Sequence, residues 1–77
     1  MEEKNDFGVQ PLDGVITRLG LSNSGLVQAS IEQLTHKMVQ KGRKGRRLTQ
    51  NAKLKILRAL QAAKPDEKFT LRLLFNY

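Results

Sequence analysis

The sequence SIEQLTHKMVQKGRKGRRLT, residues 30–49, joins an expected helix start directly to a dense basic segment. Ser30 is followed three residues later by Gln33, the spacing of a capping box, in which each of the two side chains satisfies a free backbone N–H group. A capping box marks the N-terminus of a helix. The sequence therefore predicts that a helix begins at Ser30.

The residues after this cap carry apolar side chains at helical spacing. They predict a helix over residues 31–41 with one buried face. Glycine adopts backbone conformations that other residues avoid, so Gly42 and Gly45 predict the end of this helix. The segment 41–47 is then expected to be a basic loop. The expected inner face consists of Ile31, Leu34 and Met38, helped by Thr35.

Length and composition restrict the class of protein. A chain of 77 residues forms one domain with a small core. It has no cysteine and one histidine, which argues against disulfides and against structural zinc. No apolar run is long enough to span a bilayer, and the acidic N-terminus does not resemble a signal peptide. We expect a cytoplasmic protein without a cofactor.

The charges are distributed unevenly along the chain. The net charge is +7, yet residues 33–65 alone carry ten Lys or Arg side chains and no Asp or Glu. Charge concentrated in one segment favours a single binding face for a polyanionic partner, either nucleic acid or an anionic membrane surface.

The N-terminal part predicts a tail and two helices. Residues 1–10 show no periodicity and are expected to be a flexible tail, with Phe7 and Val9 as contacts between its end and the core. Residues 11–77 are expected to be the folded domain. Pro11 suits the first position of a helix that ends near Gly20. Ser22 or Asn23 can cap a second, short helix that ends between Val27 and Ala29.

The C-terminal part predicts one helix and an ambiguous last segment. Thr49 is expected to cap a helix that ends at Lys64 and Pro65, with Lys53, Lys55 and Arg58 on its outer face. The segment FTLRLLFNY alternates like a strand, yet Thr70 can also cap a short helix, with Phe69 packed onto Leu74. We favour the helix. The expected fold is all-α, a compact bundle of four or five short helices.

Two groups of side chains are candidates for binding nucleic acid. Gln can bond adenine and Lys can bond guanine, so the outer face of helix 31–41 is a candidate for base contacts. The basic loop 41–47 is a candidate for phosphate contacts, because counterion release by clustered cations supplies non-specific affinity. The candidate residues are Gln33, His36, Lys37, Gln40, Lys41, Arg43, Lys44, Arg46, Arg47 and Lys53.

Each pattern also has a less specific interpretation. The basic run could be a solvated loop or a nuclear-import signal, and the face of helix 31–41 could be an ordinary wet surface. The fourth helix could lie in a lipid interface, but its apolar residues are needed for the core. His36 has no nucleophile or metal-ligand partner, so the sequence does not predict an enzyme. Aromatic residues lie only near the ends, which favours double over single strands.

From Leu26 to Leu60 the chain resembles the small helix-turn-helix domains of the phage-repressor and Lac-repressor types. The resemblance rests on a helix end, a cap, an apolar-hydroxyl pair and the start of the next helix, with a basic loop about three residues longer and Gln28 in place of the usual turn glycine. The residues that carry it are Leu26, Val27, Ser30, Leu34, Thr35, Leu48, Thr49, Ala52, Lys53, Ile56, Leu57 and Leu60.

This resemblance implies a bacterial or phage protein that binds double-stranded DNA, is often dimeric, and regulates transcription at the nucleoid. Helix 31–41 would then enter the major groove and loop 41–47 would contact phosphates, with sequence-specific or semi-specific binding. The alternatives are an RNA-binding or ribosome-associated protein and an adaptor that binds an acidic protein. The apolar C-terminal segment could close the monomer core or form a homodimer contact.

Overall fold

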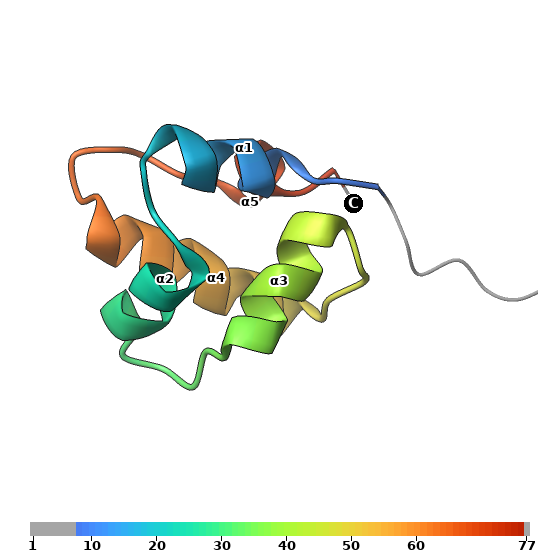
Figure 1. The fold of residues 1–77 in the computed structure, drawn as a ribbon, viewed down its shortest axis with the longest axis horizontal. Coiled ribbons are helices and arrows are strands. Elements are labelled where there is room, and N and C mark those ends of the chain that lie inside the picture. The colour runs from blue at the N-terminus through green and yellow to red at the C-terminus, as the bar shows by residue number, and fades with distance from the viewer. Residues whose placement is uncertain (1–7, 77) are drawn as a thin grey trace, which may run out of the picture.

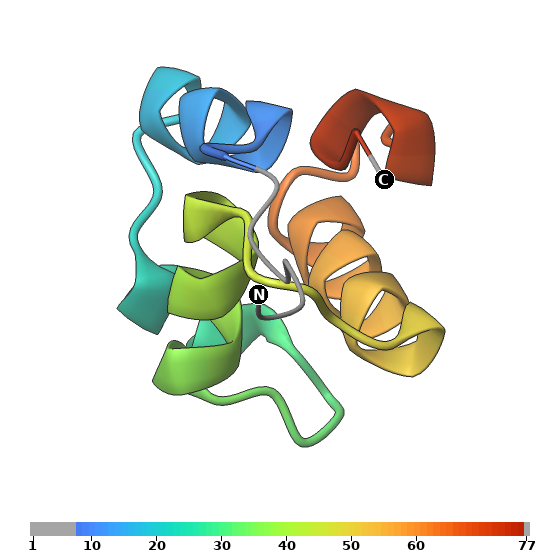
Figure 2. The same ribbon diagram turned by 90° about the vertical axis from the view of Figure 1, so that its right-hand side faces the viewer.

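The computed structural model describes residues 8–76, which form five helices joined by short connections (Figure 1). Two of these helices, α1 and α5, lie side by side and cover the other three, as the two perpendicular views show (Figures 1 and 2). The all-α fold is confirmed, and residues 8–76 contain no strand. The helices are α1 Pro11–Arg18, α2 Asn23–Ala29, α3 His36–Lys44, α4 Gln50–Ala63 and α5 Leu71–Leu74.

Four of the expected helix starts are confirmed. Pro11 occupies the start of α1, and the hydroxyl of Ser22 accepts a hydrogen bond from the backbone N–H of Gly25 at the start of α2. The hydroxyls of Thr49 and Thr70 accept equivalent bonds at the starts of α4 and α5. The C-terminal segment is therefore a short helix rather than a strand. A side-chain acceptor at these positions satisfies one of the free N–H groups of each first turn.

The predicted start of the third helix is wrong, because α3 begins at His36 and not after Ser30. The backbone N–H of Ser30 still donates to the carbonyl of Leu26, so Ser30 belongs to the end of α2. Its hydroxyl bonds both backbone groups of Glu32 within a local turn. Thr35 caps α3 instead, since its hydroxyl accepts from the N–H of Met38 at 3.1 Å. Ser30 and Thr35 are both suitable N-cap residues, and Thr35 is the one that starts α3.

This shift changes the environment of the residues before α3. Ile31, expected inside, is 99% exposed, whereas Leu34 is buried. Gln33 is exposed in the connection and does not lie on a helix. The helix-turn-helix resemblance implies a tight turn around Gln28, but the second and third helices are joined by a six-residue connection, residues 30–35.

Gly42 does not end α3 as expected, whereas Gly45 does. Gly42 is buried inside the helix, where an added Cβ would lie 3.1 Å from Ile56 and 3.2 Å from both Leu12 and Leu48. Gly45 has a φ of +91°, the left-handed conformation that commonly ends helices. The expected basic loop 41–47 is therefore divided. Residues 41–44 belong to α3, and only the residues from Gly45 onward connect it to α4.

The expectation of a flexible tail over residues 1–10 is wrong for its last part. Gln10 is 2% exposed, and its backbone N–H donates to the carbonyl of Arg43 at 3.1 Å. Its side-chain amide donates to the carbonyl of Gly8 and accepts from the N–H of Asn76. Val9 is 72% exposed and does not attach to the core. Residues 1–7, including Phe7, lie outside the described residues.

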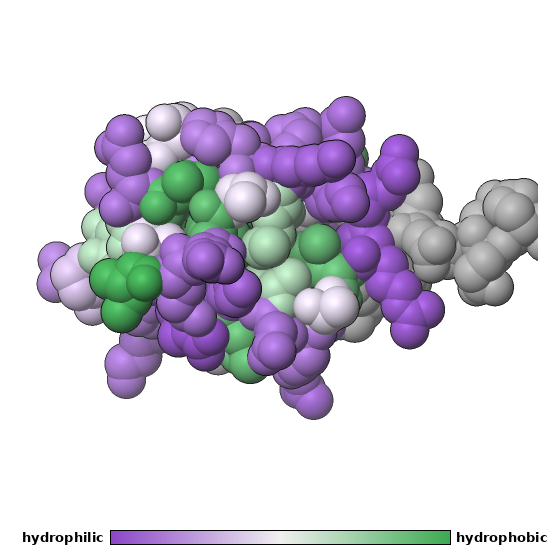
Figure 3. All heavy atoms as spheres, turned by 90° about the horizontal axis from the view of Figure 1, so that it is seen from below, coloured by the Kyte–Doolittle hydropathy of each residue, from purple (hydrophilic) through white to green (hydrophobic). Residues whose placement is uncertain are grey.

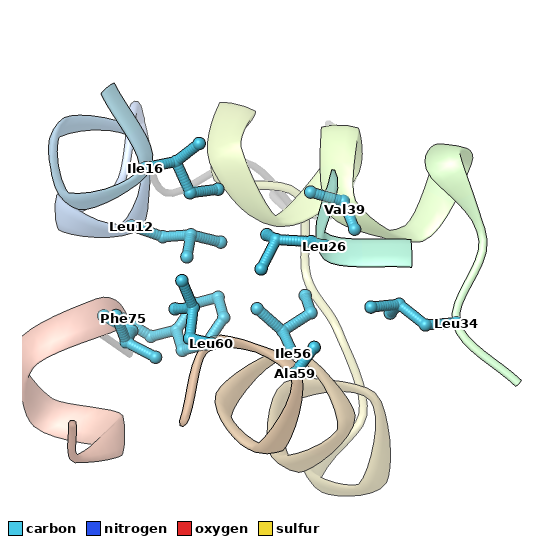
Figure 4. Packing of buried hydrophobic residues seen from close by; sticks show 10 residues of the cluster. Leu12, Ile16, Leu26, Leu34, Val39, Ile56, Ala59, Leu60 and Phe75 are labelled. Carbon is cyan, nitrogen blue, oxygen red and sulfur yellow. The ribbon is translucent and has the colours of Figure 1, made fainter. Parts of the chain in front are cut away.

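The core lies where all five helices meet (Figure 4). Leu26 of α2 and Val39 of α3 face Ile56 and Leu60 of α4, while Leu12 of α1 closes the cluster on the side of α5. All five side chains are fully buried. The inner faces of α3 and α4 are thereby fixed, and their opposite faces point outward. The fully or largely buried apolar residues are Leu12, Ile16, Leu26, Leu34, Val39, Ala52, Ile56, Ala59, Leu60, Leu74 and Phe75.

We predict opposite effects for two glycine substitutions. Gly45→Ala should destabilise the fold by at least about 1–2 kcal/mol, because its backbone is left-handed and its Cβ would overlap the carbonyl of Gly8. Gly14→Ala should stabilise the fold by about 0.5–1 kcal/mol, because Gly14 lies inside α1 with open space around it. Urea unfolding of both variants measures the difference. Equal effects of the two substitutions would contradict the described end of α3.

We also predict that two neighbouring apolar residues differ in their contribution to stability. Leu34→Ala should cost about 2–5 kcal/mol, as for buried leucines in general. Ile31→Ala should change the free energy of unfolding by less than about 0.5 kcal/mol, because the side chain is exposed. Thermal or urea unfolding checks both. A large loss of stability in Ile31→Ala would instead support the helix start at Ser30 that the sequence predicts.

Candidate nucleic-acid interface

The exposed face of α3 is the strongest candidate for a binding site. Its side chains recur every three or four residues, so they project from one side of the helix. The opposite side carries Val39 and Gly42, both buried against other helices. Because α3 contacts α1, α2 and α4, the exposed face is held in place by the whole fold. The exposed face consists of His36, Lys37, Gln40, Lys41 and Lys44.

Two further exposed cations follow the end of α3 along the chain. Arg46 and Arg47 are exposed and follow Gly45 directly. The nearest acidic residues along the chain are Glu32 and Asp66, so no acidic side chain interrupts the basic segment. None of the ion pairs seen within residues 8–76 involves Lys37, Lys41, Lys44 or Arg47. We call these exposed residues of α3, together with Arg46 and Arg47, the basic face.

Arg43 does not belong to the basic face, although it is one of the predicted site residues. Its Nε lies 2.6 Å from a carboxylate oxygen of Asp13 on α1. Its guanidinium also donates to the side-chain oxygen of Asn23 on α2 at 2.8 Å. The backbone carbonyl of Arg43 accepts the bond from Gln10. Arg43 therefore joins α3 to α1, α2 and the N-terminal segment, rather than projecting from a loop.

Lys53 is also placed differently from the prediction. It is 8% exposed, and its ammonium lies 5.8 Å from the centre of the Phe75 ring, within cation–π range. Lys53 lies next to Ala52 and one turn before Ile56 on the buried side of α4. A long side chain can bury its methylene groups there. The sequence prediction placed every charged residue of this helix outside, which is wrong for Lys53.

Arg58 carries its positive charge in an ion pair beside the connection 30–35. It is exposed on α4 and binds both carboxylate oxygens of Glu32, at 2.5 and 2.7 Å. The hydrogen bond from Arg58 lowers the pKa of Glu32, and the same bond raises the pKa of Arg58. The pair leaves Arg58 locally neutralised, so it differs from the cations of the basic face.

Sequence reasoning missed Asn23 as a participant in this site. It lies at the first position of α2, and its side-chain N–H donates to the side-chain oxygen of Gln40 at 2.9 Å. The sequence identifies Asn23 only as a candidate cap, because its contact with α3 depends on how two helices pack. No local pattern carries that information.

Other kinds of site are not evident in the described part of the chain. An apolar depression of about 110 Å³ lies between the end of α2 and α4, lined by Ala29, Ile31 and Ala59 among others. It is smaller than typical small-molecule pockets, which begin near 300 Å³. Figure 3 shows how green apolar groups are separated by purple polar side chains on the face seen from below.

Within residues 8–76, no three His, Cys, Asp or Glu side chains lie close enough together to hold a metal ion. The helices of the same residues are too short or too polar to cross a membrane. Comparison with known proteins gives no match to a family model, to a curated protein or to a solved structure. Within residues 8–76 the basic face is the candidate binding site.

We predict that Arg43 and Lys44 contribute differently to stability. Arg43→Ala should destabilise the fold by about 1–3 kcal/mol, because it removes charge-assisted hydrogen bonds to two other helices. Lys44→Ala should change the free energy of unfolding by less than about 0.5 kcal/mol, because Lys44 is exposed. Urea unfolding in moderate salt compares them. Equal stability of the two variants would mean that Arg43 does not hold the helices together.

Proposed function

We propose that this protein binds double-stranded DNA through the basic face and acts as a transcriptional regulator. The observation that carries the proposal is that one side of α3 presents His36, Lys37, Gln40, Lys41 and Lys44 to solvent while its other side is fixed in the core. A helix held in this way offers cations and an amide group in a rigid array. The backbone that carries these side chains is therefore already ordered before binding.

The dimensions and chemistry of α3 suit the major groove. A helix with its side chains is about 10–12 Å wide, and the major groove of B-DNA is about 12 Å wide. Lys37 supplies donors that bond guanine, and Gln40 supplies a donor and an acceptor that bond adenine. His36 lies in the first turn of α3, beside Lys37. These residues form the base-contacting part of the proposal.

We assign the phosphate contacts to the cations near the end of α3 and just after it. Lys41, Lys44, Arg46 and Arg47 lie on the exposed side of the segment 41–47. Each cation that neutralises a phosphate releases counterions, which supplies affinity for any DNA sequence. The proposed base contacts thus come earlier along the chain, within α3, and the proposed phosphate contacts follow them.

Duplex DNA fits this face better than RNA does. The major groove of an RNA duplex is too deep and narrow for side chains to reach the bases. Single strands are usually bound on several exposed aromatic rings. The basic face carries no Phe, Tyr or Trp, and of the phenylalanines in the described residues Phe69 is half-buried and Phe75 is buried.

We expect two pairs of cations to contribute differently to DNA binding. Arg46→Ala with Arg47→Ala should weaken binding to all duplexes alike and reduce the magnitude of the salt slope by about 0.9 for each phosphate that is no longer neutralised. Arg18→Ala with Arg72→Ala is the matched control, because it removes two exposed arginines from α1 and α5. Fluorescence anisotropy with labelled duplexes at several salt concentrations measures the slopes. Equal slopes for the two double variants would contradict the assignment of the phosphate contacts.

Lys37→Ala should instead change the preference among sequences. A good base contact contributes roughly 1–3 kcal/mol of discrimination, so selection from a random duplex library should lose one preferred position. Lys55→Ala is the control, since Lys55 lies on α4 outside the basic face. Identical selected sequences for the parent and Lys37→Ala would exclude Lys37 as a base contact.

A further inference from the structure

A chain of hydrogen bonds crosses three helices and ends at Gln40 on the basic face. The carboxylate of Asp13 on α1 accepts from the guanidinium of Arg43 on α3 at 2.6 Å. The same guanidinium donates to the side-chain oxygen of Asn23 on α2 at 2.8 Å. The side-chain nitrogen of Asn23 then donates to the side-chain oxygen of Gln40 at 2.9 Å.

This chain fixes which way the amide of Gln40 points. A guanidinium only donates hydrogen bonds, so the atom of Asn23 that faces Arg43 is its oxygen. The other atom of the Asn23 amide is a nitrogen, which also donates, so the atom of Gln40 that faces Asn23 is its oxygen. If the Gln40 amide turned over, two N–H₂ groups would face each other and the hydrogen bond would break.

The fixed orientation determines what Gln40 presents to a partner. Its Nε2 points away from Asn23 and keeps both hydrogens for a ligand, and its Oε1 keeps one of two lone pairs. A donor and an acceptor side by side match the N7 and N6 positions of adenine. Because the order of donor and acceptor is fixed, the match holds for adenine on one strand and fails for adenine on the other.

We propose that Asn23 is a positioning residue that fixes the Gln40 amide in one orientation, and that this orientation selects adenine on one strand of the bound duplex. The inference rests on the proposed function, because it assigns a base contact to the basic face. Asp13 and Arg43 act through Asn23, since they determine which of its side-chain atoms faces Gln40.

Asn23→Asp is the informative substitution. A carboxylate at position 23 can still accept from Arg43, but it has no hydrogen to donate to Gln40. The Gln40 amide should therefore turn over and donate its N–H to the carboxylate. Asn23→Ala removes the contact without favouring the reversed orientation, so its effect on adenine preference should be only a few-fold.

The orientation can be measured without DNA. In the NMR spectrum of the free protein, the side-chain N–H₂ of Gln40 should exchange rapidly with solvent in the parent. In Asn23→Asp one of its protons should shift downfield and exchange more slowly, because it is now hydrogen-bonded. An unchanged Gln40 side-chain signal in Asn23→Asp would overturn the positioning role.

Selection from a random duplex library tests the consequence for DNA. The parent should prefer adenine at one position, and Gln40→Ala and Asn23→Asp should each reduce that preference by roughly 5- to 150-fold, the range for one bidentate base contact. In the Gln40→Ala background, Asn23→Asp should cause no further reduction in preference. Asn51→Asp is the control, because it adds the same charge at an exposed position of α4 and should retain the preference.

The outcomes separate this inference from the proposed function. A parent that binds duplex DNA with an adenine preference unaffected by Gln40→Ala or Asn23→Asp would overturn the base contact. Uniform weakening across all sequences by Gln40→Ala would assign Gln40 to a phosphate and overturn it as well. If the parent binds no duplex at all, the proposed function and the base contact both fail, while the NMR measurement still decides the orientation of Gln40.

Discussion

The close approach at Gly42 is the constraint on which the position of α3 depends. A Cβ at this position would meet Ile56 of α4, Leu12 of α1 and Leu48 at 3.1–3.2 Å, which is tighter than side chains normally pack. The absence of a side chain lets α3 lie directly against the core. The inner side of α3 is thereby fixed, and its cations are forced outward.

Polar contacts hold the C-terminal part of α3 from the other sides. Arg43 pairs with Asp13, and the carbonyl of Arg43 accepts from Gln10, which in turn accepts from Asn76. These contacts bring both ends of the described chain to the same place. The bond between Arg43 and Asp13 is charge-assisted and therefore stronger than the neutral bonds of Gln10. The negative charge of Asp13 offsets part of the repulsion among the clustered cations.

The fold could be predicted from the sequence wherever a local signal acted alone. Thr49 starts α4 as expected, because its capping hydroxyl is followed by one sustained helical apolar pattern. Thr70 also starts a helix, although the residues after it alternate like a strand as well. Ser30 and Thr35 compete over five residues, and the choice between them depends on how far α2 continues. A glycine such as Gly42 can break a helix or let it pack closely, and only the neighbouring helices decide which. These are properties of the packed structure.

The candidate site could likewise be predicted only where local sequence carried the information. The basic face could be foreseen in part, because cations without acidic neighbours occur at helical spacing. The structural role of Arg43, the burial of Lys53 and the contact of Asn23 with Gln40 could not, since each joins residues that are distant in sequence. A charged residue is normally exposed, and burial of one requires a partner that the local sequence does not reveal.

The claim that the basic face binds duplex DNA can be tested by an NMR titration of the labelled protein. A random-sequence duplex of about one and a half helical turns should be added at low salt and then challenged with moderate salt. We expect the backbone amide shifts to concentrate in residues 35–47 and to reverse as salt increases. Shifts that concentrate on α1 and α5, or no shifts at low salt, would contradict the claim.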